Sequence, residues 1–162
     1  MIRFAQQKDL PAIVSIYNQS VPKRNATADL SPISVESRQS WFEHHTANRP
    51  LYVWVNEQNH ILAWASLSDY YPRAAYHITA EISIYVDEQQ QGKGLGKALA
   101  KHILKEAPNL GIHNIIAVIF GHNTASITLF EQLGFSLWGK LPEVCELDNK
   151  FADIILLGKK CL

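Results

Sequence analysis

Glycines at every second position over Gly92–Gly96 constrain this chain more than any other feature of its sequence. A strand-like apolar segment ends at Val86, and a helical repeat of apolar residues begins at Leu95. Glycine adopts positive φ and has no Cβ, so the backbone of such a turn can approach a ligand closely. The first amides of the helix then point outward, beside the positive end of the helix dipole. The turn therefore predicts an anion site suited to a phosphate or pyrophosphate, with Lys93 and Lys97 adding charge at its rim.

Two common phosphate-binding motifs do not fit this turn. A nucleoside-triphosphate loop needs glycine, four residues and then Gly-Lys-Ser/Thr. Here Gly96-Lys97 is followed by Ala98, and Gln91 stands where the first glycine belongs. The dinucleotide fingerprint GxGxxG, started at Gly92, would need a glycine at Lys97. An ordinary helix-capping loop would not need all three glycines.

Length and composition favour one compact domain over residues 1–162. The chain is 47% hydrophobic and carries 15 basic and 15 acidic side chains, so whole-chain disorder is excluded. It lacks the basic excess typical of proteins that bind nucleic acid through its phosphates. The longest apolar run, Ile115–Phe120, is too short to span a membrane, and the N-terminus has no signal-peptide core. We therefore expect a cytoplasmic protein with neither nucleic-acid nor membrane partners.

The sequence predicts no metal site. Cys145 and Cys161 lack CxxC spacing, which argues against a zinc knuckle and against a disulfide framework. His44 and His45 are adjacent, so on a helix they point in different directions and cannot share one metal ion.

Apolar periodicity predicts the element order β-α-α-β-β-β-α-β-α-β-β, an α/β class with a mixed sheet and helices on both faces. We expect strands at residues 2–5, 51–55, 61–68, 76–86, 115–120, 135–141 and 151–158. Helices should begin at the caps Asp9 and Ser34, after the glycine turn and at Asn123, with the second ending near residue 47 and the last closed by Gly134. In the strand 76–86, Glu81 should face away from its apolar neighbours unless a bulge intervenes.

Two motifs of the chain resemble those of a known family. The turn, written Gln91-x-x-Gly94-x-Gly96, resembles the coenzyme-A pyrophosphate loop of the GCN5-related N-acetyltransferases, the GNAT superfamily. The helix from Asn123 that ends in Gly134-Phe135 resembles the second signature of that family. The closer resemblance is to the phosphinothricin and methionine-sulfone acetyltransferase branch. It is carried by Ile16-Tyr17-Asn18, Arg73-x-x-Tyr76-x-x-x-Ala80-Glu81 and Ser83-Ile84-Tyr85-Val86.

The resemblance implies acetyl-CoA as donor and the primary amine of a small amino-acid-like molecule as acceptor, of the phosphinothricin, methionine sulfone or methionine sulfoximine type. It implies a GNAT-like splayed sheet, in which the strands that carry Val86 and Phe120 separate to admit the cofactor. It places the pantetheine along Ile84, Tyr85 and Val86 and beside Asn123. The pyrophosphate would lie on Gln91, Gly92, Lys93, Gly94, Leu95, Gly96 and Lys97. Relatives often dimerise, so a homodimer is expected.

Transfer to an amine needs a base, because an amine is mostly protonated at neutral pH. Glu81 is the candidate, directly or through a water, although a solvated strand residue is the alternative interpretation. The resemblance points to the backbone N–H near Val86 as donor to the developing oxyanion. Arg73 is a candidate clamp for a substrate carboxylate, and Tyr76 a candidate wall of the amine pocket. A solvated arginine and a packed tyrosine are the alternatives.

The chain departs from the family pattern in three places. Phe130 stands where relatives carry Tyr or His, so the acid that protonates the CoA thiolate is unassigned, with Tyr85 and His122 as stand-ins. The segments 25–28 and 142–150 also differ, which leaves the acceptor open. A protein N-terminus, a polyamine or an antibiotic amine is an alternative acceptor. A CoA-binding sensor without turnover is the alternative to an enzyme.

Overall fold

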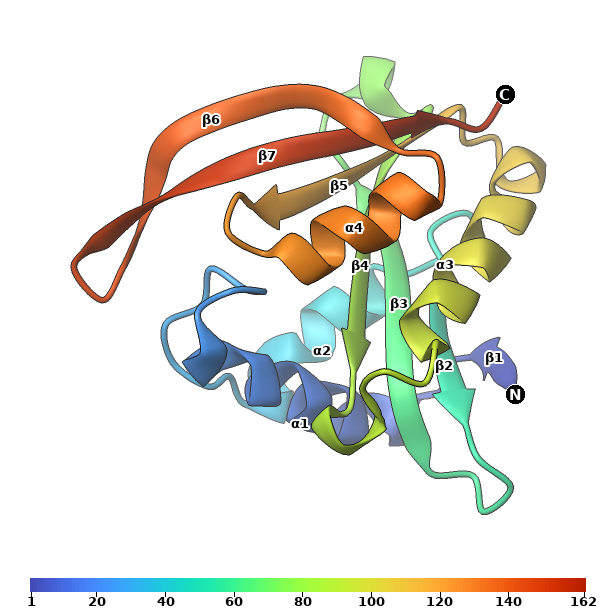
Figure 1. Ribbon diagram of the computed structural model, residues 1–162. Coiled ribbons are helices and arrows are strands. Elements are labelled where there is room, and N and C mark those ends of the chain that lie inside the picture. Colours follow the sequence, from blue (N-terminus) through green and yellow to red (C-terminus); the bar gives the residue numbers. More distant parts are fainter.

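The computed structural model describes residues 1–162 as a seven-stranded mixed sheet with four helices (Figure 1). The strands are β1 (Ile2–Phe4), β2 (Leu51–Val55), β3 (Ile61–Asp69), β4 (Thr79–Val86), β5 (Asn114–Phe120), β6 (Ser136–Leu147) and β7 (Lys150–Lys160). The helices are α1 (Leu10–Ser20), α2 (Val35–Glu43), α3 (Leu95–Glu106) and α4 (Thr124–Gln132). The strand order is β1-β2-β3-β4-β5-β7-β6, and only the β4–β5 pair is parallel. The predicted class and element order are confirmed.

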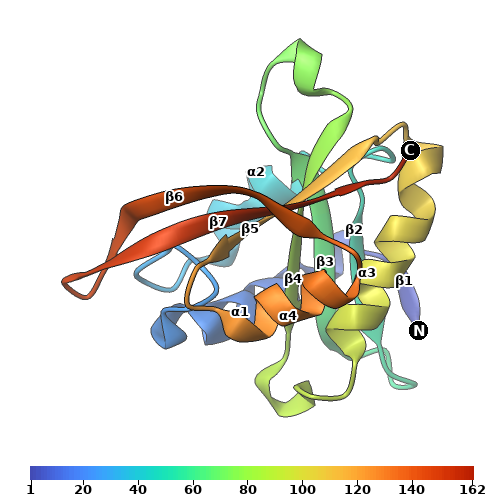
Figure 2. The same ribbon diagram turned by 45° about the horizontal axis from the view of Figure 1, so that its top comes forward.

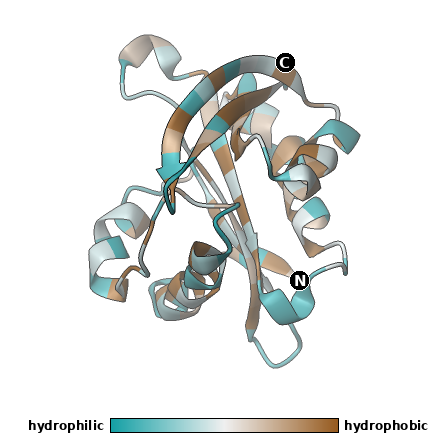
Figure 3. Cartoon of the chain, turned by 60° about the vertical axis from the view of Figure 1, so that its left-hand side comes forward, coloured by the Kyte–Doolittle hydropathy of each residue, from teal (hydrophilic) through white to brown (hydrophobic).

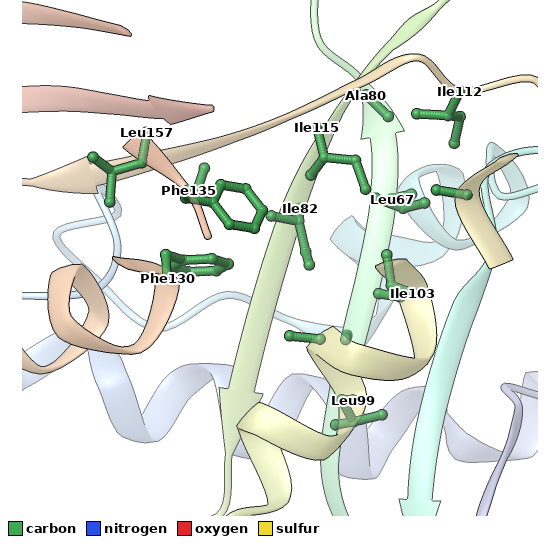
Figure 4. Close-up of a cluster of buried hydrophobic side chains, with 14 of the residues drawn as sticks. Leu67, Ala80, Ile82, Leu99, Ile103, Ile112, Ile115, Phe130, Phe135 and Leu157 are labelled. Atoms are coloured by element: carbon green, nitrogen blue, oxygen red, sulfur yellow. The ribbon is translucent and has the colours of Figure 1, made fainter. Parts of the chain in front are cut away.

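Alternation along the strands builds one buried cluster on each face of the sheet. On β2, Val53 and its alternate neighbours pack with α1 residues such as Ile13, whereas Tyr52 belongs to the cluster on the other face. That second cluster joins β3, β4 and β5 to Leu99 of α3 and Phe130 of α4 (Figure 4). The hydrophobic stretches along the sheet are visible in Figure 3. Helices therefore cover both faces, as predicted.

The sheet splays at its centre. β4 and β5 pair only from Thr79 with Asn114 to Glu81 with Ile116. Beyond this point β5 continues to pair with β7, while β4 stays on β3, so the two strands diverge (Figure 1). The predicted separation of the strands that carry Val86 and Phe120 is confirmed.

The register of β3 with β4 runs unbroken from Ala63–Val86 to Asp69–Ala80. No bulge interrupts β4, so Glu81 faces the side of α1 and α2 while Ile82 faces α3, as the alternation predicted.

Local capping is confirmed at two helices and wrong at a third. The Ser34 hydroxyl accepts from the Ser37 N–H, and the Asn123 side chain accepts from the Ser126 N–H. Asp9 does not cap α1 with its side chain. It accepts instead from the Gln6 N–H and from the Arg3 guanidinium, because a short 3-10 turn precedes the helix.

Three predicted boundaries are wrong. β4 begins at Thr79 rather than at residue 76, because Ala74–Tyr76 form a turn of 3-10 helix. α2 ends at Glu43 rather than near residue 47, because Thr46 and Arg49 pair with each other in an isolated antiparallel β-bridge. β6 and β7 run through the segment 142–150 as one long hairpin, closed at Asp148–Asn149. Both turn residues have positive φ, as the tight turn requires.

β5 contains the apolar run Ile115–Phe120, and six of its seven residues are buried. Val118 is the exposed one, and it lies beyond the point where β4 and β5 diverge. None of the helices is both long and apolar enough to cross a membrane.

Candidate active site

A cavity of about 680 Å³ opens where β4 and β5 separate. Its volume lies in the range of cofactor and small-molecule sites. It is lined by β4 from Ile82 to Val86, by β5 from Ala117 to Phe120, by the glycine turn and by the start of α4. All the residues predicted to hold the cofactor line it except Lys93: Ile84, Tyr85, Val86, Gln91, Gly92, Gly94, Leu95, Gly96, Lys97 and Asn123.

The glycine turn has the geometry of an anion site. Gly92 and Gly94 have φ of +76° and +79°, and nothing lies within 4 Å of a Cβ built on either. Gly94 is the N-cap of α3, and the first helical bond joins the Ala98 N–H to its carbonyl, so the three preceding amides remain free. The Gln91 side chain fixes the turn by donating to the Val86 carbonyl at 3.0 Å.

Two lysines at this turn have only neutral partners. Lys93 Nζ lies 3.0 Å from Gln90 Oε1, and Lys97 Nζ lies 3.4 Å from Gln132 Oε1. Neither charge is paired with a carboxylate within 4 Å, so both remain available to an anion. Free amides, a helix dipole and two lysines together suit a pyrophosphate.

The backbone of β4 offers a second set of contacts. The Asp87 N–H donates to the Leu62 carbonyl at 2.9 Å, which makes these two residues a hydrogen-bonded pair of the antiparallel ladder. Such pairs alternate, so Ile84 and Val86 direct their peptide groups away from β3, toward the gap left by β5. A pantetheine arm has amides that could pair with this free strand edge.

A second cavity, of about 220 Å³, lies on the other side of β4 and contains Glu81. Ser83 and Tyr85 line both cavities, so the two meet at β4. Glu81 is also the last β4 residue paired with β5, and it therefore stands at the point where the strands part. Its carboxylate has no hydrogen-bond or ion-pair partner, and burial raises its pKa. A raised pKa brings a carboxylate closer to the value that suits a general base near neutral pH.

The helices close the second cavity with a group that the sequence did not single out. Arg38 of α2 lies over the Tyr17 ring, 4.8 Å from its centroid, and over the Trp41 ring, at 5.2 Å. The Tyr17 hydroxyl donates to Asp29 and contacts Thr27. The i, i+3 spacing of Arg38 and Trp41 could have indicated a shared helix face, but nothing in the sequence shows what that face meets.

Arg73 and Tyr76 lie elsewhere. Both are exposed on the connection between β3 and β4, outside the lining of either cavity. Figure 2 shows this connection projecting beyond the end of the sheet. Tyr76 contacts Tyr71 there, with ring centroids 5.2 Å apart. The structure does not bring these two residues together with Glu81, and their predicted roles stay predictions.

The candidate acids are occupied by other contacts. The Tyr85 hydroxyl donates to the Ala26 carbonyl at 3.2 Å, and burial raises its pKa, which makes it a weaker acid. A His122 ring nitrogen lies 2.8 Å from the Arg24 carbonyl. Phe130 is buried in the core and also lines the larger cavity. The acid stays unassigned.

The divergent segment 25–28 lies over the site. The Asn123 amide, besides capping α4, donates to the Asn25 carbonyl at 2.8 Å. Asn25 and Ala26 line the larger cavity, and the adjacent Arg24 forms an ion pair with Asp148 at the tip of the β6–β7 hairpin, at 3.0 Å. The residue that precedes the segment 25–28 is therefore bound to the segment 142–150, the other part of the chain that departs from the family pattern.

Comparison with known proteins agrees with this geometry. Residues 10–135 match the family model described as "Acetyltransferase (GNAT) family". A Bacillus subtilis (strain 168) protein, YwnH, provisionally named a phosphinothricin acetyltransferase, is 46% identical over 98% of both chains. The L-methionine sulfoximine/L-methionine sulfone acetyltransferase of Pseudomonas aeruginosa is 34% identical over 96% of this chain and 91% of its own.

A solved structure extends the comparison to the cofactor. The Sinorhizobium meliloti GNAT superfamily phosphinothricin acetyltransferase, in complex with AcCoA, has a TM-score of 0.93 and 32% identity. The match covers 99% of this chain and 87% of that one. These findings confirm the resemblance indicated by the two glycine-containing motifs.

Proposed function

Because the chain belongs to the GNAT family of acetyltransferases, which use acetyl-CoA, we propose that it acetylates the primary amine of a small amino-acid-like molecule. The names of its relatives support phosphinothricin, methionine sulfone or methionine sulfoximine as acceptor types. The small volume of the cavity around Glu81 supports a small acceptor over a protein N-terminus. The cytoplasmic location expected from the sequence stays a prediction.

The observation that carries this proposal is the meeting of two cavities at β4. Acetyl-CoA would enter the larger one, with its pyrophosphate on Gln91, Gly92, Gly94, Leu95, Gly96 and Lys97, which line it, and beside Lys93, which does not. Bound there, it supplies an acetyl group already activated as a thioester. The acceptor would enter the smaller cavity, so that the amine and the acetyl group approach each other past Ser83 and Tyr85.

In the proposed mechanism Glu81 takes one proton from the substrate ammonium, directly or through a water, and leaves a neutral amine to attack. The Val86 N–H, which points into the gap between β4 and β5, donates to the acetyl oxygen as negative charge develops on it. Asn123 borders the pantetheine arm from the start of α4. As the tetrahedral intermediate collapses, the C–S bond breaks and the nitrogen loses its second proton to water. A thiolate is a good leaving group, so water can also supply its proton, which no side chain is assigned to give.

The test measures CoA thiol release from acetyl-CoA with a panel of amines. The panel contains phosphinothricin, methionine sulfone, methionine sulfoximine, common amino acids and polyamines. Glu81→Gln should lower kcat by about 10²-fold or more, and should abolish the fall in activity at acid pH that protonation of Glu81 causes. Glu57→Gln, on the exposed β2–β3 turn, removes the same charge and should leave kcat unchanged.

The outcomes of the amine panel test the acceptor class, the enzymatic activity and the role of Glu81 separately. Turnover of polyamines but not of the amino acids and their analogues would overturn the acceptor class. Acetyl-CoA binding without turnover of any amine would favour the sensor. Full activity in Glu81→Gln would overturn the base while leaving the acceptor class intact.

We also propose that the enzyme is a homodimer, supported by exposed apolar side chains on the β6–β7 hairpin, among them Leu137 and Phe151. Arg73 and Tyr76 stay candidates for substrate binding. Since neither lines a cavity of the single chain, their role would depend on movement of the β3–β4 connection or on the second copy.

A further inference from the structure

The smaller cavity contains groups of both charge signs. Glu81 lies on its β4 wall, and Arg38 of α2 lines the same cavity. No ion pair joins the two side chains within 4 Å. An α-amino acid carries an ammonium and a carboxylate on one carbon. We propose that Arg38 binds the carboxylate of the acceptor while Glu81 receives its ammonium, an inference that rests on the proposed function.

The Arg38 guanidinium is held in place, but its N–H donors form no hydrogen bond within the chain. It lies over the Tyr17 and Trp41 rings, and its nearest carboxylate, Asp29, is 3.8 Å away. That distance is too long for a hydrogen bond, and the guanidinium makes no hydrogen bond to any other group of the chain. The rings and Asp29 therefore orient the side chain, while its planar set of N–H donors stays free for a carboxylate.

Three hydroxyls in the same cavity are also free. Ser66 and Ser68 of β3 and Ser83 of β4 line it, and none of their hydroxyls forms a hydrogen bond within the chain. Ser66 is only 2% exposed. None of the three hydroxyl oxygens is sealed off from solvent, so they are open to the cavity and available to the polar atoms of a ligand bound there.

The aromatic walls complete the match to a small amino acid. Trp64 stacks on Tyr85, with centroids 4.8 Å apart, and both rings line the cavity together with Trp41. These rings would bound the acceptor side chain, while the hydroxyls meet its polar oxygens. Arg73, the carboxylate clamp suggested by the sequence, lies outside this cavity.

The experiment compares two acceptors that differ only in the carboxylate: L-methionine sulfone and its decarboxylated counterpart, 3-(methylsulfonyl)propan-1-amine. In the wild type, kcat/KM should favour the amino acid. Arg38→Met should lower kcat/KM for the amino acid by about 10- to 100-fold, and for the amine by less than about threefold. Arg38→Lys should keep part of the preference, since it retains the charge but loses the planar donors.

The control is Lys101→Met, which removes one exposed positive charge from α3 and should change neither value. If the melting curve shows that Arg38→Met does not fold, the test uses Arg38→Lys instead, through the ratio of its kcat/KM values for the amino acid and the amine. If Arg38 variants keep the wild-type preference, the inference is overturned, and loss of preference in a parallel Arg73→Met variant would place the carboxylate there. If the wild type itself shows no preference for the amino acid, the proposed acceptor class fails and the inference with it.

Discussion

Glu81 lies on β4 with no hydrogen-bond partner, and burial raises the pKa of its carboxyl. The same isolation that suits a base makes the ionised form unfavourable in the folded protein. A carboxyl whose pKa is higher in the folded than in the unfolded state binds more protons when folded. Stability therefore falls as pH rises from below the unfolded pKa through the folded one.

We expect Glu81→Gln to be more stable than the wild type at pH 8, because glutamine carries no charge to desolvate. The gain should be about 2–4 °C in Tm, the shift that 1 kcal/mol produces in a domain of this size. The gain should shrink toward zero at pH values below 4.5, the ordinary pKa of a glutamate, because wild-type Glu81 is then protonated in both the folded and the unfolded state. Melting curves of both proteins across pH measure this, and an equal or larger gain at acid pH would contradict it.

At the level of single residues, the sequence predicts Glu81 as the candidate base and the face of β4 on which it lies, but not the residues that surround it. Alternation along β4 is local information, so the face on which Glu81 lies follows from neighbours one and two residues away. Arg38 lines the same cavity as Glu81 only because α2 packs against that face of the sheet, and no local pattern in the sequence shows this arrangement. Arg73 and Tyr76 show the opposite limit: they match a motif close to Glu81, yet a 3-10 turn places them beyond the end of the strand.

The glycine turn and α3 work as one element, because Gly94 both ends the turn and caps the helix. Gly111 offers a matched comparison: its φ is +72°, and nothing lies within 4 Å of a Cβ built there, as at Gly94. Gly111 follows the end of α3 and lies outside the cofactor cavity. Comparing the same substitution at Gly94 and at Gly111 therefore separates the effect of backbone strain from the effect on cofactor binding.

Gly94→Ala and Gly111→Ala should each lose about 1–2 kcal/mol of unfolding free energy, since both place a Cβ in the left-handed region. Only Gly94→Ala should also raise KM for acetyl-CoA, by about tenfold, because the new Cβ and the strained turn displace the amides that meet the pyrophosphate. Urea denaturation and steady-state kinetics measure the two effects. A similar rise of KM in Gly111→Ala would show that the strain, not the anion site, is responsible.

Among the elements, the ones with strong local signals are predicted well. The caps Ser34 and Asn123, the glycine turn and the element order follow from side-chain chemistry and periodicity. Element boundaries that are set by pairing between strands are predicted less well. β6 and β7 extend through the segment 142–150 because each supplies hydrogen bonds to the other, a pairing that the polar composition of the segment conceals.

At the scale of the whole molecule, the β6–β7 hairpin is the outer edge of the sheet and is poorly covered. Leu137, Leu141, Val144 and Phe151 are all at least 45% exposed, and hydrophobic stretches alternate with hydrophilic ones along it (Figure 3). Large exposed apolar patches on a monomer are uncommon and often mark an interface. A second copy could cover this hairpin by pairing or packing against the same surface, which a two-fold dimer requires.

We therefore expect a mass near twice the 18.3 kDa of one chain in light scattering coupled to size exclusion. Leu137→Glu combined with Phe151→Glu should give the monomer mass, since these side chains are 62% and 68% exposed and the charges would be desolvated in an interface. Phe4→Glu, on β1 at the opposite edge of the sheet and 60% exposed, should stay dimeric. A monomeric wild type would overturn the homodimer. A double variant that stays dimeric would exclude the hairpin as its interface, and a monomeric Phe4→Glu would place the interface at the β1 edge.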